Sequence, residues 1–321
     1  MVRNHTKIKE FILMGFQEFS ELQVLFFLIF LTIYIVTIMG NILVLLLIVL
    51  DSHLKSPMYF FLGNLSFLEA CYSSSIFPKM ISALLTGDRT ISFNNCFTQM
   101  YFVGSFVCAE CYLLCVMSYD RYLAICKPLH YATIMKSWTS IQLVAVSWIN
   151  GFVALTVLLV LMLHLNFCSS NEIDHYFCEY FPILRLSCSD ISMMQILSFM
   201  VASLFTFPPF LLTLTSYVCI IVAILNIPST TGRQKTFSTC SSHLIVVFVF
   251  YGSLIIVYMT PKTVIRRDIQ KFLSLSYTVL SPLINPFIYS LKNKEVKDAL
   301  RNSICRNFCL LFKQVRRKFF M

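Results

Sequence analysis

The chain has 321 residues, of which 58% are hydrophobic and 12% are charged. A soluble globular domain carries about 25% charged residues, so this composition indicates a membrane protein. The net charge of +10 does not indicate nucleic-acid binding, because nine of the 25 basic residues lie in the last thirty positions and the others lie in short segments between apolar runs.

Seven apolar runs are long enough to cross a bilayer, which takes about 20 residues of α-helix. The first is too long and begins too late for a cleavable signal peptide. No internal repeat and no Gly/Ser linker divides the chain. We therefore predict an all-α membrane protein with a seven-transmembrane helix bundle over 23–291, preceded by residues 1–22. The runs lie near 23–50, 58–80, 97–119, 139–163, 192–225, 243–260 and 272–291.

The segment 292–321 is predicted to be a short amphipathic helix and a basic tail on the cytoplasmic side. Its apolar residues recur every three to five positions among lysines and arginines, the pattern of a helix at a membrane surface. Two cysteines here are either palmitoylation sites or plain reduced cysteines. The apolar residues are Leu291, Val296, Leu300, Ile304 and Phe308, and the cysteines are Cys305 and Cys309.

Two features favour an amino terminus outside the cell. Asn4 begins an Asn-His-Thr glycosylation sequon, which is used only on the lumenal side. Cys96, Cys168, Cys178 and Cys188 all fall on the same side as the amino terminus, and four clustered cysteines suit an oxidising compartment. They predict two disulfides, and the sequence by itself leaves three pairings open.

Two acidic residues lie in the middle of apolar runs, Glu69 and Glu110. Charges inside the membrane are costly and by default indicate function. If the two face each other, they either share a proton or hold a cation such as sodium between them, and the alternative is a neutral, hydrogen-bonded Glu. Arg121 follows Glu110 by 11 residues, which places both on nearly the same helix face, about 16 Å apart in depth.

Asp120 and Arg121 stand side by side at the inner end of the third run. The pair suits an ion pair at the water boundary, and a neighbouring helix that competes for the arginine would make it a bistable switch. The alternative is an arginine that extends to the interface and switches nothing.

Several motifs occur in order, one set for each run. They are "GN" (40–41), "PMYFFLGNLSFLE" (57–69), "MSYDRYLAICKPLHY" (117–131), "SYVCIIVAIL" (216–225), "KTFSTCSSHLIVVFVFYG" (235–252) and "PLINPFIYSLKNKEVKDAL" (282–300). Together with "NHTKIKEFILMGF" (4–16), they resemble the olfactory receptors, a branch of the rhodopsin-like G-protein-coupled receptors. Tyr251-Gly252 replaces the tryptophan motif of most other rhodopsin-like receptors, which favours the olfactory branch.

The resemblance implies a function: a multi-pass plasma-membrane receptor that binds a small odorant, activates the stimulatory olfactory heterotrimeric G protein and raises cyclic AMP. It implies no catalysis and no cofactor apart from a sodium ion at Glu69 and Glu110. It also implies the disulfides Cys96–Cys178 and Cys168–Cys188 and a glycan on Asn4. The residues of its G-protein switch would be Asp120, Arg121, Tyr122, Tyr217, Asn285, Pro286 and Tyr289.

Alignment of the motifs with the family also implies the walls of an odorant site. None of the implied wall residues is charged, so a charged ligand would lose its hydration without gaining a partner. Neutral, volatile and weakly polar molecules fit better, with Cys108, Tyr258 or Thr278 as the hydrogen-bonding group. The implied wall residues are Val103, Gly104, Val107, Cys108, Val201, Ala202, Phe205, Leu254, Ile255, Tyr258 and Thr278.

Two histidines raise the question of a metal. His175, Cys178 and Glu179 in "HYFCE" have the chemistry of copper or zinc ligands, but a disulfide at Cys178 would remove the thiolate, so a structural loop is the better interpretation. We expect His243 to be a packing or hydrogen-bonding residue.

Other classes of function fit less well. A transporter that relays ions through the two acids would show repeats and broken helices in matching halves. A membrane enzyme would show a nucleophile with a base, or an array of metal ligands. The main alternative is a rhodopsin-like receptor for another small lipophilic ligand outside the olfactory system.

Overall fold

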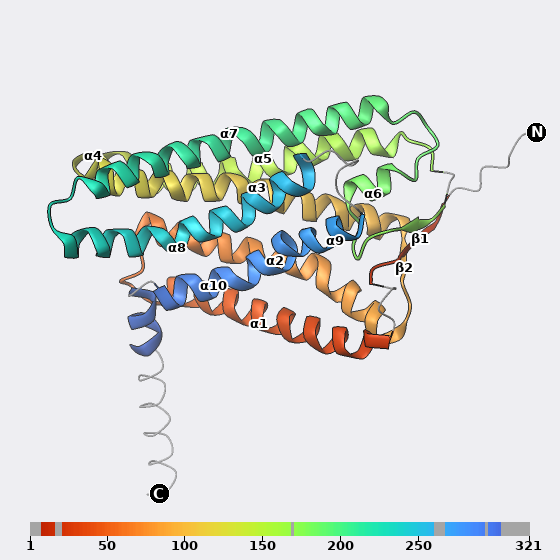
Figure 1. The fold of residues 1–321 in the computed structure, drawn as a ribbon, viewed down its shortest axis with the longest axis horizontal. Coiled ribbons are helices and arrows are strands. Elements are labelled where there is room, and N and C mark those ends of the chain that lie inside the picture. Colours follow the sequence, from red (N-terminus) through yellow and green to blue (C-terminus); the bar gives the residue numbers. More distant parts are fainter. Residues whose placement is uncertain (1–7, 17–20, 168–169, 260–266, 293–294, 303–321) are drawn as a thin grey trace, which may run out of the picture.

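Seven long helical stretches lie side by side along one axis (Figure 1). The structure is a computed structural model that describes residues 8–16, 21–167, 170–259, 267–292 and 295–302. Each predicted apolar run lies in one of these stretches. They are α1 (Gln23–Leu50), α2 (Pro57–Thr86), α3 (Phe93–Cys126), α5 (Ser137–Leu163), α7 (Ser192–Leu225), α8 (Thr230–Leu254) with the π-helical turn η2 (Ile255–Met259), and α9 (Arg267–Leu275) with η3 (Ser276–Leu280) and α10 (Ser281–Lys292).

The helix ends follow from local sequence. Pro57 begins α2, where its missing N–H is not needed. Gly87 ends the same helix with a positive φ of 76°, and its N–H donates to the Ala83 carbonyl at 3.0 Å. Ser92 caps α3 by accepting a hydrogen bond from the Asn95 backbone N–H at 3.3 Å. These caps place the loops at the two ends of the bundle.

The bundle has an apolar outside and a partly polar inside. Within the described ranges, α1, α3, α5 and α7 are each long and apolar enough to cross a membrane. The outer faces expose large apolar side chains; Val24 is 72% exposed and Leu50 is 70% exposed. In contrast, Asn41, Glu69 and Glu110 are at most 1% exposed. This distribution suits hydrocarbon as the surrounding solvent.

Small residues let the helices approach closely around α3, which packs against α2, α5 and α7. A Cβ on Gly151 of α5 would overlap the Ser105 carbonyl oxygen and lie 2.9 Å from the Ala109 nitrogen. A Cβ on Gly40 of α1 would lie 3.1 Å from the ring of Pro286 in α10. Glycine at these two positions therefore sets the separation between helices.

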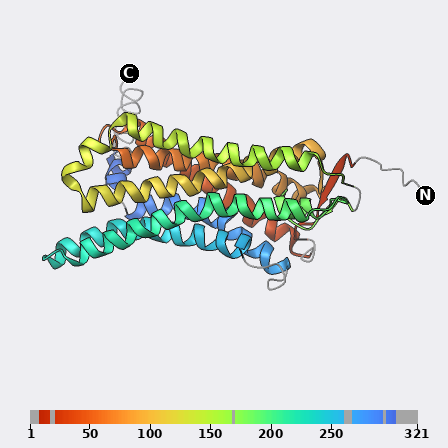
Figure 2. The same cartoon turned by 90° about the horizontal axis from the view of Figure 1, so that it is seen from above.

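A small sheet covers the end of the bundle at the right of Figure 1. The strand β1 (Glu10–Leu13) lies between β2 (Thr90–Ser92) and β3 (Glu172–Ile173). It pairs antiparallel with β2, with Phe11 opposite Ile91, and parallel with β3, with Ile12 opposite Glu172. The short helix α6 (Tyr180–Leu184) lies at the same end (Figure 1), and the second view also places the red strand β1 there (Figure 2). The amino-terminal segment and the loop before α7 thus share one structure.

The opposite end carries α4 (Pro128–Ile134) and a helical stretch over 295–302. In this stretch Val296 and Ala299 are buried, while Lys297 and Arg301 are exposed. The Tyr59 hydroxyl donates to Glu295 at 2.7 Å and ties the stretch to α2. The beginning of the predicted amphipathic helix is therefore confirmed, and its remainder, with Ile304, Cys305, Phe308 and Cys309, lies outside the described residues.

The close contact at Gly151 gives a test of the packing. We expect Gly151→Ala to lower stability by about 1–3 kcal/mol, because the new methyl group would overlap the backbone of α3. Thermal unfolding of the receptor in detergent measures this change. Gly252→Ala is the matched control, since a Cβ there meets no atom within 4 Å. Equal melting temperatures for the two variants would contradict the packing described here.

Candidate functional site

The loop between α5 and α7 is fastened to α3 by a disulfide between Cys96 and Cys178, whose Cα atoms are 5.4 Å apart. The Cys178 backbone N–H also donates to the Gln99 side chain at 2.9 Å. Because Cys96 and Gln99 lie on the first two turns of α3, both bonds hold the loop over the amino-terminal end of that helix.

Cys168, which the family resemblance pairs with Cys188, lies outside the described residues. The neighbouring backbone is consistent with that pairing, since Phe167 and Ser187 form an antiparallel bridge. The Cys188 N–H donates to the Asn166 carbonyl at 2.9 Å. The Cys168–Cys188 bond remains a prediction, as does the glycan on Asn4, which also lies outside the described residues.

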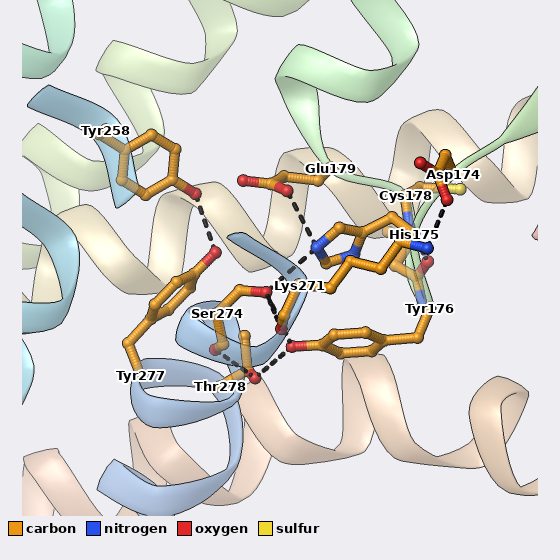
Figure 3. Close-up of polar contacts among 11 residues, drawn as sticks. Asp174, His175, Tyr176, Cys178, Glu179, Tyr258, Lys271, Ser274, Tyr277 and Thr278 are labelled. Carbon is orange, nitrogen blue, oxygen red and sulfur yellow. Dashed lines mark hydrogen bonds and ion pairs between the residues drawn. The ribbon is translucent and has the colours of Figure 1, made fainter. Parts of the chain in front are cut away.

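A second group of contacts fastens the same loop to the seventh helical stretch (Figure 3). The Tyr176 hydroxyl is 2.7 Å from the Thr278 hydroxyl and donates to Ser274 at 3.3 Å. Asp174 forms an ion pair with Lys271 of α9. The loop therefore bridges α3 and α9–η3 and lies across the end of the space between them.

Beneath this loop is a cavity of about 110 Å³. One water needs about 10–15 Å³ of such space, so the cavity has room for a small organic molecule. Its lining is mostly apolar, as is usual for small-molecule sites. Most of the wall residues expected from the sequence lie here: Val103, Gly104, Val107 and Cys108 of α3, Val201 and Ala202 of α7, Leu254 of α8 and Tyr258 of η2.

Three expected wall residues do not line this cavity in the described structure. Phe205 packs against Tyr112, with ring centroids 6.1 Å apart. Ile255 begins the π-helical turn η2, and such a turn changes the direction of side chains relative to a regular α-helix. The Thr278 hydroxyl is engaged by Tyr176.

The structure adds wall residues that the sequence did not predict. Several come from the loop, among them Phe177, Glu179, Tyr180 and Phe181, and Leu155 comes from α5. Glu179 was not among the expected wall positions, and it adds a carboxyl group to an otherwise uncharged lining. The expected disulfide was the available signal that residue 179 lies near the cavity. Cys96 lies seven residues, or two helical turns, before Val103, so both are on the same face of α3. The bond to Cys96 brings Cys178, and with it residue 179, close to that face.

His175 is buried behind Glu179, and its Nε2 lies 3.2 Å from a Glu179 carboxyl oxygen and 3.1 Å from the Ser274 hydroxyl. Burial lowers the pKa of His175 to about 3, and the positive charge of Lys271 acts in the same direction. The ring is therefore neutral near pH 7. Among the described residues no group of three His, Cys, Asp or Glu side chains could hold a metal ion. With Cys178 in a disulfide, the loop is structural and does not form the metal site considered above.

The two intramembrane acids lie deeper in the bundle and contact the seventh helical stretch. The Asn285 amide donates a hydrogen bond to Glu69, and the Ser281 hydroxyl donates to Glu110 at 3.3 Å. In the described structure, the second carboxyl oxygen of each acid and the Ser73 hydroxyl have no hydrogen-bond partner. These buried oxygens are the kind of ligand that a hard cation prefers.

The inner half of the bundle holds the expected switch residues. Asp120 accepts a hydrogen bond from the Tyr131 hydroxyl of α4 at 2.9 Å, and no ion pair with Arg121 occurs among the described residues. Tyr217 of α7 is hydrogen-bonded to His243 of α8. The expectation that His243 is a hydrogen-bonding residue is therefore confirmed.

Further contacts connect this region with the cavity. The Tyr251 hydroxyl of α8 donates to the Cys111 carbonyl of α3 at 2.6 Å, and Cys111 itself lines the cavity. Pro286 packs against the Gly40 position, as described above. The side chain of Tyr289 lies outside the described residues.

The helix bundle with a loop-covered cavity at one end has the architecture of a seven-helix membrane protein. The solved structure of squid rhodopsin has this fold, with a TM-score of 0.70 and 15% identity over 89% of this chain and 86% of that one. The sequence model of the olfactory receptor family matches residues 30–307. The chain is 48% identical to olfactory receptor 10A4 of Homo sapiens over 95% of its own length and 98% of the relative's. It is 50% identical to olfactory receptor 10A5 of Homo sapiens over 93% and 95%, respectively.

The chain therefore belongs to the olfactory receptor family. Its members are G-protein-coupled receptors and not enzymes. The predicted seven-helix membrane fold is confirmed by the family and by the shared fold with squid rhodopsin.

Proposed function

We propose that this receptor binds small, neutral, volatile and mainly apolar odorants in the cavity beneath the loop. The observation that carries the proposal is the cavity itself, whose walls are largely apolar and come from α3, α7, α8 and the loop. Burying an apolar ligand against these walls gives about 25 cal/mol for each Å² of apolar surface removed from water.

The proposed orientation places the amino terminus and residues 1–22 outside the cell, the bundle in the plasma membrane, and residues 292–321 in the cytoplasm. The disulfide between Cys96 and Cys178 supports it, because such bonds persist in oxidising compartments. The sheet of β1, β2 and β3 lies at the same end, so the extracellular surface would include all three strands.

In the proposed mechanism, ligand binding favours an open state of the inner end and thereby activates a stimulatory G protein that raises cyclic AMP. A ligand shifts this equilibrium only by its differential affinity for the two states. The hydrogen bond of Tyr251 supports a connection between the cavity and α8, since it joins α8 to the cavity-lining Cys111 of α3. Movement of α8 would also break the Tyr217–His243 contact. In the open state Arg121 would then contact the G protein.

The proposed sodium ion would be held by Glu69, Glu110 and the Ser73 hydroxyl. The buried, unbonded oxygens of these three side chains fit a hard cation. A bound cation would supply positive charge between two carboxylates that repel each other in a low dielectric. Asn285 and Ser281 orient the two acids through their other oxygens and so couple the site to α10.

The switch is tested by Arg121→Ala in cells that express the receptor. We expect the odorant-induced rise in cyclic AMP to be lost while surface display is unchanged, because the proposed contact with the G protein is removed. Lys127→Ala is the control, since it removes an exposed positive charge six residues further along the chain.

A response that survives Arg121→Ala would contradict the switch. A ligand response that raises calcium but leaves cyclic AMP unchanged would contradict coupling to the stimulatory type.

The cation site is tested by the thermal stability of purified receptor in sodium chloride and in choline chloride at equal ionic strength. Sodium at ten times the Kd of the site stabilises the folded receptor by about 1.4 kcal/mol, so the melting temperature of wild type should be higher in sodium chloride than in choline chloride. We expect Glu69→Gln to abolish the difference. Equal melting temperatures of wild type in both salts would favour a shared proton in place of the ion.

A further inference from the structure

Glu179 occupies a junction between two cavities. Its side chain is 3% exposed, and it lines both the inner cavity and an outer one of about 240 Å³. The outer cavity is polar, with Asp174, Arg185 and Lys271 in its walls. The Glu179 carboxyl group therefore lies where the two cavities adjoin.

The carboxylate is held from the loop side by His175. Nε2 of this ring lies 3.2 Å from one carboxyl oxygen, and Figure 3 shows the other oxygen directed toward the Tyr258 hydroxyl. Tyr258 is itself 3.1 Å from the Tyr277 hydroxyl. The His175 ring is neutral and its Nε2 is hydrogen-bonded to Ser274, while Lys271 is paired with Asp174, so neither places an unpaired positive charge on Glu179.

The inner cavity thus combines an apolar body with an acceptor at one end. Val103, Val107, Val201 and Leu254 form part of the apolar body, and Glu179 lies at its outer end. A carboxyl group carries acceptor lone pairs in either protonation state, so Glu179 can accept a hydrogen bond from a donor on the ligand. A hydroxyl brings one donor, whereas a primary ammonium brings three, and the largely apolar wall offers few further acceptors.

We propose that Glu179 determines the specificity of the cavity and that the favoured ligand is a neutral apolar alcohol whose hydroxyl donates to Glu179. This inference rests on the proposed odorant site and deepens it by naming the chemical class. A hydrogen bond of this kind is worth up to about a tenfold preference over the same molecule without the donor.

The experiment compares aliphatic alcohols with the methyl ethers and the primary amines of the same chain length. Two readouts are used: cyclic AMP in cells with measured surface display, and the melting temperature of purified receptor as direct evidence of binding. In wild type we expect the alcohol to be about tenfold more potent than the ether and more potent than the amine.

The variants are Glu179→Met, which removes both acceptor oxygens, and Glu179→Gln, which keeps the size and one neutral acceptor. We expect the alcohol to be at most about threefold more potent than the ether in Glu179→Met, and the potency ratio in Glu179→Gln to be intermediate. If Glu179→Met does not fold, Glu179→Gln provides the test. Glu172→Met is the matched control, because Glu172 is exposed and lines only the outer cavity. It should leave the ratio unchanged.

Each contrary outcome has a distinct meaning. Equal potency of ether and alcohol in wild type, or an unchanged ratio in well-displayed Glu179 variants, overturns the assignment of Glu179. An amine more potent than the alcohol overturns the hydroxyl class. Alcohols that raise the melting temperature of wild type without changing cyclic AMP overturn the proposed signalling and leave the Glu179 assignment supported by binding. Failure of every alcohol to bind overturns the assignment itself.

Discussion

The hydrocarbon of a bilayer offers no hydrogen-bond partner, and this constraint accounts for most of the architecture. Backbone groups must be satisfied within helices, so the chain crosses as seven helical stretches, and polar side chains turn inward. Glu69 with Asn285, and Glu110 with Ser281, are the clearest cases, since each joins two helices that are distant in sequence. Inward polar contacts of this kind specify which helices meet, whereas the outer faces contact hydrocarbon and require only apolar side chains.

The outer end follows a different rule, because water is available there and the covalent bond between Cys96 and Cys178 decides the arrangement. That bond brings a loop from between α5 and α7 over α3, and the contacts of Tyr176 and Asp174 extend it to the seventh helical stretch. The cavity therefore has walls of helix and a roof of loop. The helices fix the positions of the apolar residues that line the cavity. The loop adds the acidic residue Glu179 to this lining.

The sequence predicted the parts of this structure that depend on periodicity and composition. Apolar runs of sufficient length gave all seven stretches, and the run at 23–50 matches α1 at both ends. Motif alignment with the family proposed Val103, Gly104, Val107 and Cys108 as wall residues on one face of α3, and all four line the cavity. Periodicity and composition could not predict the roof. The position of Glu179 depends on the disulfide between Cys96 and Cys178, which are 82 positions apart in the sequence. Ile255 shows another limit, since apolar spacing does not reveal a π-helical turn.

The central claim is that ligands act from within the cavity. Ala202→Trp tests it most directly, because the larger side chain would fill space that Ala202 now lines. Leu204→Trp is the matched control on the same helix, where Leu204 is 62% exposed on the outer face. With surface display and basal cyclic AMP equal to wild type, the account predicts that Ala202→Trp raises the half-maximal odorant concentration at least tenfold and that Leu204→Trp leaves it unchanged. Equal responses of the two variants to every active odorant would contradict the account.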